Sequence, residues 1–259
     1  MDEKMTDPKT LPTLVLFHAF PLSSGMWKPQ LQALKGLARP IPVDLPGFGS
    51  AKPFARGKKP SIAGMARLAA KELDRLGVRG PVMAAGISMG GYVALEFARL
   101  YPKRVGALGL FSTRPGADAP EQKKKRRALA QSVLREGTVL LVKKSAPALL
   151  GKTTLRRNPS LLRLIGRMIR RNGPQGPADS LVAMAGRRDN TAVLKRFQGP
   201  VLVIAGREDG VISPDESRAM GRLVRRAEVT VLAGAGHLVN LEKPQAFNRV
   251  LVSFLKKHR

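Results

Sequence analysis

The hydrophobic residues of this chain cluster in short uninterrupted runs and do not alternate with polar residues. Runs of this kind are typical of strands that are buried on both faces, as in a parallel sheet. We expect six such strands along the chain. Their predicted ranges are residues 13–17, 40–44, 81–85, 105–111, 200–205 and 229–232.

Apolar residues at helical spacing separate several of these runs. They recur every three or four positions in residues 65–76, and Gly77 would end that helix. Helices are also expected in residues 90–100, 214–224 and 244–257. Strands that alternate with helices predict an α/β fold with a mostly parallel, doubly wound sheet.

The middle of the chain has a different pattern. Residues 112–198 show no strand, and glycine and proline residues divide the segment into short stretches that favour helix. These expected helices cover residues 122–135, 139–150, 160–171 and 179–184. We therefore predict a helical cap, residues 112–198, inserted between two parts of one α/β core, residues 1–111 and 199–259.

The charge of the chain is strongly unbalanced, with a formal net charge of +28. The predicted cap alone carries 20 Lys and Arg against five Asp and Glu. Such a field attracts nucleic acids, acidic membranes and anionic small molecules alike. Phe197 is the only aromatic residue of the cap, so bases would have little to stack on and we expect no specific nucleic-acid partner. The hypothesis is that the cap favours anionic substrates.

Several classes of protein are disfavoured by what the chain lacks. It has no cysteine, which excludes disulfides, cysteine-ligated zinc and thiol catalysis. Residues 1–10 carry charges and no apolar core, so they do not resemble a secretory signal. No apolar stretch is long enough to span a membrane. We expect a soluble, cytoplasmic protein without a cofactor or a metal, whose oligomeric state stays open.

A glycine-flanked serine is the first candidate for chemistry. Gly86, Ser88 and Gly90 form a G-x-S-x-G motif that follows a predicted strand and opens a predicted helix. This context is that of a nucleophile elbow, whose tight turn requires small residues on both sides of the serine. A chance match is the alternative, because the bare motif is common. The strand–turn–helix context favours Ser88 as a nucleophile.

A serine nucleophile needs a base, and the chain has three histidines. His237 lies in a glycine-rich loop after the last predicted strand, from which it can reach a site at the strand ends. A histidine on a surface loop is the alternative interpretation. His258 is next to the C-terminus and is expected to be solvated. His18 is expected to brace its loop, although the sequence leaves some doubt about which histidine is catalytic.

The remaining groups of a hydrolytic site are expected at other strand ends. An acid between serine and histidine in chain order would orient the imidazole, and Asp209 follows the predicted strand 200–205. Glu208 and Asp215 are the rivals, and Asp215 also suits the first turn of a helix. Two backbone N–H groups should bind the developing oxyanion, and we expect those of Phe20 and Met89.

At this point the chain resembles the α/β-hydrolase superfamily, and most of all its small-ester and lactone hydrolases, such as 3-oxoadipate enol-lactonase and related carboxylesterases. The resemblance implies Ser88, Asp209 and His237 as a catalytic triad, with Phe20 and Met89 as oxyanion donors. The family usually has His-Gly where this chain has His18 followed by alanine. The resemblance rests on residues 16–22 with Trp27, and on residues 44–49, 86–92, 200–209 and 236–244.

The expected activity is hydrolysis of a small carboxylic ester or lactone through an acyl-enzyme on Ser88. Two other reactions could use the same triad, namely cofactor-free perhydrolysis of the haloperoxidase type and hydrolysis of a carbon–carbon bond. A non-enzymatic alternative is a basic protein that binds nucleic acid or other anions on a degenerate hydrolase fold.

Overall fold

The computed structural model describes residues 11–258, and the prediction made for residues 1–10 lies outside this range. Within it, six parallel strands form one sheet in the order β2-β1-β3-β4-β5-β6. The predicted parallel α/β sheet is therefore confirmed. The strands are β1 (Thr13–Phe17), β2 (Arg39–Val43), β3 (Val82–Ile87), β4 (Val105–Phe111), β5 (Val201–Gly206) and β6 (Ala227–Leu232).

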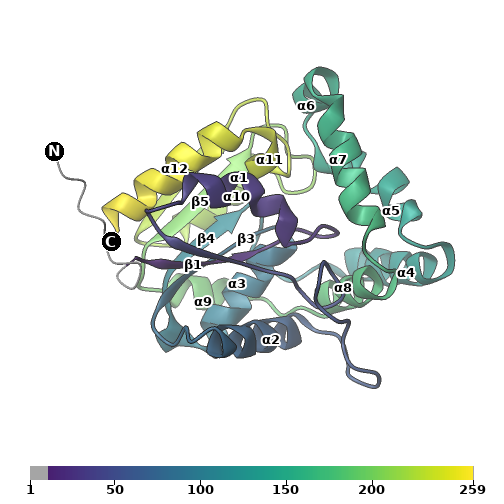
Figure 1. Cartoon of the computed structure of the whole chain (residues 1–259), viewed down its shortest axis with the longest axis horizontal. Helices are drawn as coiled ribbons and strands as arrows, with labels where there is room; N and C mark the ends of the chain where they lie inside the picture. Colours follow the sequence, from purple (N-terminus) through teal and green to yellow (C-terminus); the bar gives the residue numbers. More distant parts are fainter. Residues whose placement is uncertain (1–10, 259) are drawn as a thin grey trace.

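Helices cover both faces of this sheet, as Figure 1 shows. One face carries α2 (Ile62–Arg75) and α3 (Met89–Leu100), and the other carries α1 (Lys28–Ala33) and α12 (Pro244–Lys257). Every residue of β3 and β5 is buried, which explains their uninterrupted apolar sequences. The edge strand β6 is mostly half-buried and begins at Ala227, two residues before its predicted start.

Capping side chains set the first residues of two core helices. Ser61 Oγ accepts a hydrogen bond of 3.0 Å from Gly64 N, so α2 begins at Ile62, before the predicted residue 65. Ser213 and Glu216 form a reciprocal capping box at the start of α10 (Pro214–Arg222). Asp215 lies in the first turn of that helix. The short helix α11 (Val239–Glu242) follows β6 and leads into α12.

The insertion between β4 and β5 is helical, as predicted. The expected helix 139–150 is divided, because α5 stops at Lys144 and Pro147 opens a short 3₁₀ turn. Two further short helices, α6 and α9, were not predicted. The insertion contains α4 (Pro120–Glu136), α5 (Val139–Lys144), the 3₁₀ turn Pro147–Leu149, α6 (Lys152–Arg157), α7 (Pro159–Arg170), α8 (Gln175–Ala185) and α9 (Thr191–Arg196).

These helices do not all lie in the same place. In Figure 1, α4 to α8 extend beyond one end of the sheet, whereas α9 lies beside α3. The backbone of Gly47, with a φ of 81°, meets that of Gly176 in α8 so closely that a Cβ on either residue would overlap the other. The insertion therefore packs on the loop after β2. The domain boundaries at residues 112 and 198 stay a prediction.

Candidate functional site

Ser88 stands at a strained turn between β3 and α3. Its backbone has φ 55° and ψ −114°, a left-handed conformation that is costly for a residue with a side chain. Ser88 N donates a 2.9 Å hydrogen bond to Phe111 O at the end of β4, and Thr113 Oγ1 donates one of 2.8 Å to Ser88 O. The serine is half-buried between two fully buried neighbours. The local geometry is that of the predicted nucleophile elbow.

The glycines of the motif are required by close backbone contacts. A Cβ on Gly86 would overlap the backbone of Gly90, and a Cβ on Gly90 would overlap the carbonyl of Phe17 in β1. The first overlap would push α3 away from β3, and the second would push α3 away from β1. The small residues on both sides of Ser88 therefore have the steric role that the sequence predicts for them.

Asp209 and His237 form a buried pair, although they are 28 positions apart in the chain. His237 Nδ1 lies 2.8 Å from Asp209 Oδ2 and 3.0 Å from Oδ1. Because a carboxylate can only accept, Nδ1 carries the hydrogen and Nε2 is left to accept a proton. Asp209 Oδ1 also accepts hydrogen bonds from the backbone of Val211 (2.8 Å) and Ile212 (3.0 Å). This geometry is the one that a carboxylate needs in order to orient a histidine as a general base.

Asp209 is held as a carboxylate by its partners. Its burial by itself would raise the pKa. The His237 ring and the backbone N–H groups of Ile212 and Val211 outweigh burial and keep the pKa of Asp209 below its ordinary value. An ionised carboxylate at this position stabilises the imidazolium that forms when His237 takes a proton.

The two rival acids are engaged elsewhere. Glu208 accepts hydrogen bonds from Thr153 N (2.8 Å) and Thr153 Oγ1 (2.6 Å) in α6. Asp215 is exposed and pairs with Arg218 one turn further along α10, at 2.7 Å. Of the three candidates, only Asp209 contacts His237.

Hydrogen bonds between adjacent strand ends connect the elbow with the loop of His237. Ser88 N bonds to Phe111 O, Ser112 N to Ile204 O, and Arg207 N to Leu232 O. All of these donors follow the carboxyl end of a strand, where ligands bind in open α/β sheets. Within residues 11–258, no hydrogen bond joins Ser88 Oγ to His237. Such bonds are often long in unliganded enzymes. The complete triad therefore stays a prediction.

The predicted oxyanion donors lie on the two loops expected for them. Met89 is the first residue of α3, where a backbone N–H has no acceptor within the helix. Phe20 is half-buried in the loop after β1. The position of Met89 directly after Ser88 suits an oxyanion donor. Both assignments stay predictions.

His18 has the bracing role expected of it. Its ring is fully buried, Nε2 accepts a 3.0 Å hydrogen bond from Leu45 N, and Nδ1 lies 3.1 Å from Ala19 O. The ring also packs edge-on against Phe48. Burial lowers the pKa of His18 to about 4, although the Ala19 carbonyl and the Asp44 carboxylate oppose the shift. His18 is therefore a neutral link between the loops after β1 and β2.

The expectation for His258 is wrong. This histidine is not solvated: its side chain is 15% exposed, and Nε2 lies 2.9 Å from Glu228 Oε1. It also packs on Phe254 of α12. The ring lies against the edge strand β6, because Glu228 belongs to that strand.

Two residues that shape the rim were missed at the level of sequence. Asp44 accepts hydrogen bonds from Ser24 N (2.8 Å), Ser50 N (3.0 Å) and Ser50 Oγ (3.1 Å), and so joins the loops after β1 and β2. Thr113 Oγ1 donates a hydrogen bond to the carbonyl oxygen of Ser88 and so fixes that carbonyl. Asp44 belongs to a segment that carried the family resemblance, which is the signal that could have identified it.

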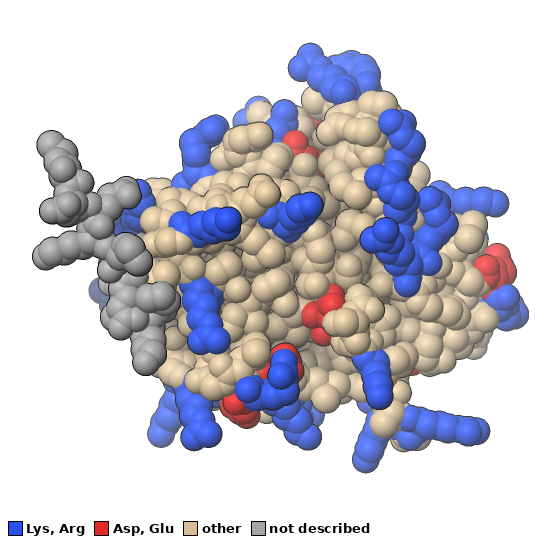
Figure 2. Space-filling model, viewed as in Figure 1, with Lys and Arg blue, Asp and Glu red and all other residues tan. Residues whose placement is uncertain are grey.

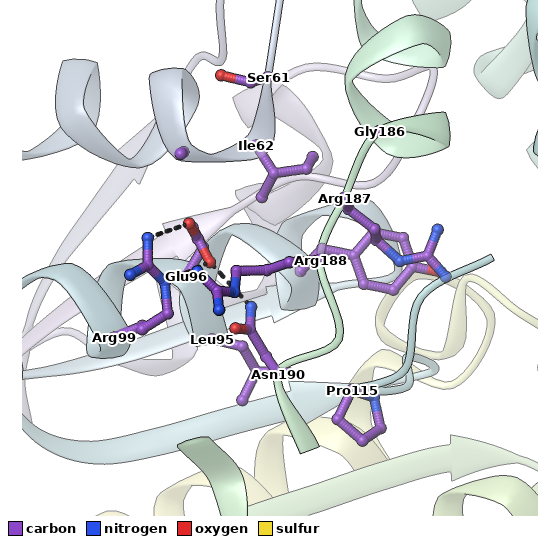
Figure 3. Close-up of a pocket in the computed structure, with 12 residues that line it drawn as sticks. Ser61, Ile62, Leu95, Glu96, Arg99, Pro115, Gly186, Arg187, Arg188 and Asn190 are labelled. Atoms are coloured by element: carbon purple, nitrogen blue, oxygen red, sulfur yellow. Dashed lines mark hydrogen bonds and ion pairs between the residues drawn. The ribbon is translucent and has the colours of Figure 1, made fainter. Parts of the chain in front are cut away.

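The described residues also enclose a cavity away from these groups. Its volume is about 230 Å³, and it lies between α2, α3 and the segment that leads from α8 to α9. Figure 3 shows Glu96 inside it, with hydrogen bonds to Arg99 and Asn190. None of the predicted site residues lines this cavity. Within residues 11–258, no cluster of His, Asp and Glu side chains could hold a metal ion.

Basic side chains gather on the helices of the insertion. Figure 2 shows Lys and Arg over the part of the surface where Figure 1 places α5, α6 and α7. In α7, the exposed Arg163, Arg167 and Arg170 lie on the face opposite the buried Leu161 and Ile165. The helices that extend beyond the sheet therefore carry a large share of the positive charge, although Lys and Arg also lie elsewhere on this face. None of the helices in residues 11–258 has the length and apolar character needed to cross a bilayer.

Comparison with known proteins agrees with this fold. An esterase from Thermogutta terrifontis, solved with malate bound, superposes with a TM-score of 0.92 at 35% identity, covering 96% of this chain and 91% of that one. The enol-lactonase from Burkholderia xenovorans LB400 gives a TM-score of 0.85 at 25% identity, covering 95% and 92%. A poly(3-hydroxyalkanoate) depolymerase from Ectopseudomonas oleovorans is 30% identical over 250 residues, 96% of this chain and 86% of its own length.

The expected resemblance to enol-lactonases and the expectation of an enzyme on this fold are thereby confirmed, because the relatives and structural neighbours include an esterase, enol-lactonases and a depolymerase. Residues 12–244 match the family described as the alpha/beta hydrolase fold. Sheet order, elbow and sequence lead to one conclusion: this chain belongs to the α/β-hydrolase family.

Proposed function

We propose that this protein hydrolyses a small carboxylic ester or lactone, with Ser88 as nucleophile, His237 as general base and Asp209 as the acid that orients it. The observation that carries the proposal is the buried Asp209–His237 pair. Its two residues lie in loops after the carboxyl ends of β5 and β6, and the strained turn at Ser88 comes directly after the carboxyl end of β3. A carboxylate, an imidazole whose Nε2 can accept a proton and an elbow serine are the groups that acyl transfer through a serine requires. The similarity to an esterase and an enol-lactonase supports the same reaction.

The reaction proceeds in two acyl-transfer steps. His237 Nε2 takes the proton of Ser88 as Oγ bonds to the carbonyl carbon, and the N–H groups of Phe20 and Met89 stabilise the oxyanion. The carbon–oxygen bond to the alcohol then breaks, and the imidazolium returns the proton to the departing oxygen. Water then attacks the acyl-enzyme in the same way: His237 takes its proton, the carbon–oxygen bond to Ser88 breaks, the proton goes to Ser88 Oγ, and the carboxylic acid is released. In a lactone, the departing alcohol stays attached to the product.

The substrate class is expected to include carboxylated esters or lactones. Exposed arginines and lysines of α5 to α7 produce a positive field over the insertion. Such a field raises the rate at which anions reach a site. The esterase from Thermogutta terrifontis was solved with malate, itself a dicarboxylate.

Replacement of Ser88 by alanine tests the proposal. We expect turnover of p-nitrophenyl acetate to fall by a factor on the order of 10⁴ or more, because a triad acts as a unit. Ser217→Ala is the matched control, since Ser217 is fully buried in α10 and its hydroxyl has no hydrogen-bond partner in the described residues. Undiminished turnover in the Ser88 variant would exclude this mechanism.

The same assay tests the substrate class. We expect kcat/KM for a p-nitrophenyl ester that carries a free carboxylate to decrease as salt is added, because salt screens long-range attraction. The neutral acetate ester serves as the control and should respond little. Equal responses of the two esters would contradict the preference for anions. If the protein turned over neither ester but cleaved a carbon–carbon bond or used hydrogen peroxide in perhydrolysis, the alternative reactions would be favoured.

A further inference from the structure

Glu242 contacts the backbone on both sides of His237. This half-buried residue ends α11, and its Oε1 accepts hydrogen bonds from Gly236 N (2.9 Å) and Leu238 N (3.2 Å). Its other oxygen, Oε2, accepts a 2.8 Å hydrogen bond from Gly151 N. Gly151 directly precedes α6 in the insertion. One carboxylate therefore joins the histidine loop to a segment 91 residues away in the chain.

The insertion touches this loop in more than one place. Leu149 O accepts a 3.2 Å hydrogen bond from Leu238 N, and Thr153 binds the Glu208 carboxylate beside Asp209. A Cβ on Gly151 would overlap the Glu208 carboxylate and the Gly236 amide. Residues 149–153 are therefore packed against the loops of both Asp209 and His237.

From these contacts we propose that Glu242 is a positioning residue, which holds the backbone of His237 and links it to residues 149–153 of the insertion. The inference rests on the proposed function. Asp209 fixes the ring of His237 through Nδ1, but it does not fix the peptide groups from which the ring projects. Hydrogen bonds to an ionised carboxylate are the stronger kind, and here they involve both neighbouring residues. A movement of the loop backbone that turned the His237 ring away would have to break these hydrogen bonds.

Local capping is the simpler explanation of this carboxylate. An acid in a short helix commonly accepts from the first N–H groups of its own turn. The hydrogen bond from Gly151 is not of that kind, because it comes from the insertion. A purely local role predicts a loss of stability alone. A positioning role predicts a loss in the chemical step as well.

Replacement of Glu242 by glutamine separates these explanations. Glutamine has the same size but only one oxygen, so it cannot accept from all three N–H groups. We expect kcat for p-nitrophenyl acetate to fall on the order of 10-fold to 100-fold, because small displacements of a catalytic group have effects of this size. KM should change less than about twofold. The low-field proton resonance of His237 Nδ1–H should shift or broaden.

Glu96→Gln is the matched control. Glu96 is more deeply buried than Glu242, but its carboxylate also accepts three hydrogen bonds, from Arg99 and Asn190. It lines the separate cavity of Figure 3. We expect this variant to lose stability while kcat and the His237 resonance stay unchanged. Active-site titration expresses every kcat per reactive serine, so a partly unfolded sample does not imitate a catalytic defect.

Two results would overturn the proposal: an unchanged kcat and resonance in Glu242→Gln, or the same changes in Glu96→Gln. Should the glutamine variant not fold, Glu242→Asp decides the question, because it keeps the charge but shortens the side chain by one methylene. It should lower kcat by about threefold to tenfold, and an unchanged kcat in it would count equally against the role. The resonance requires no turnover, so it reports on Glu242 even if Ser88→Ala disproves the proposed function.

Discussion

His18 and His237 occupy two regions of the same rim, the loop after β1 and the loop after β6. Their rings are equally buried, with 0% and 1% of their surface exposed. They differ in what their nitrogens contact. Both nitrogens of His18 are used by backbone groups of Ala19 and Leu45, whereas Nδ1 of His237 contacts a carboxylate.

This difference, and not burial, distinguishes the base that we propose from a histidine with a structural role. The lone pair on Nε2 of His18 is occupied by the N–H of Leu45, so that nitrogen cannot take a proton from a hydroxyl. For His237, no bond of Nε2 is present in the described part of the chain, and the Asp209 carboxylate holds Nδ1. The sequence left the choice between the two histidines open, and the contacts support the proposal that His237 is the base.

The largest effect is expected when the same substitution is made at both histidines. His237→Gln should lower kcat for p-nitrophenyl acetate by a factor on the order of 10⁴ to 10⁶, because the triad loses its base. His18→Gln should lower kcat by no more than about 100-fold, since it disturbs only the loop that carries Phe20. Steady-state kinetics with both purified variants provide the measurement. If the larger loss occurred at residue 18, the two roles would have to be exchanged.

Most of the fold could be predicted because buried strands leave a plain pattern. The ranges predicted for β1 and β4 agree with the structure to the residue, and β5 differs by one residue at each end. The insertion was harder, because short helices carry too little periodicity to be recognised. The helices α6 and α9, of six residues each, were not predicted, and Pro147 divided a helix that the apolar pattern had extended.

The candidate site was predictable where a motif carries the signal. Ser88 is identified by its flanking glycines, but chain order alone could not separate Asp209 from Glu208, the residue beside it. The choice depends on which carboxylate faces His237, and that is a property of tertiary packing. Thr113 and Glu242 act on backbone groups of other segments, and sequence spacing contains no trace of such contacts.

A second, smaller effect concerns stability in acid. Burial lowers the pKa of His18 to about 4, below the ordinary value of 6.5, so the unfolded chain binds this proton more readily than the folded one. The stabilisation is complete above about pH 6.5 and is lost as the pH falls through about 4. From the shift, we expect this residue to account for about 3 kcal/mol of the decrease in unfolding free energy.

Urea unfolding at a series of pH values measures this contribution. His18→Gln cannot titrate, so its unfolding free energy should fall less than that of the wild type between about pH 6.5 and pH 4. Carboxylates that do not interact with His18, such as Asp209, whose pKa is lowered, are present in both proteins and cancel in the difference. Parallel curves for the two proteins would show that His18 is not kept neutral by burial.

The smallest effect should come from the third histidine, which extends the comparison to a surface position. His258 also contacts a carboxylate, but Glu228 is 36% exposed on an edge strand and shares the same oxygen with Lys257 at 2.9 Å. Water and salt screen such a pair, so His258→Ala should change the unfolding free energy by no more than about 1 kcal/mol and leave kcat unaltered. Thermal unfolding with a parallel esterase assay tests both values. That result would show that contact with a carboxylate does not by itself identify a catalytic histidine. His237 differs from His258 in two further respects: its ion pair with Asp209 is buried, and it lies at the carboxyl end of the sheet. A loss of activity in this variant would contradict that distinction.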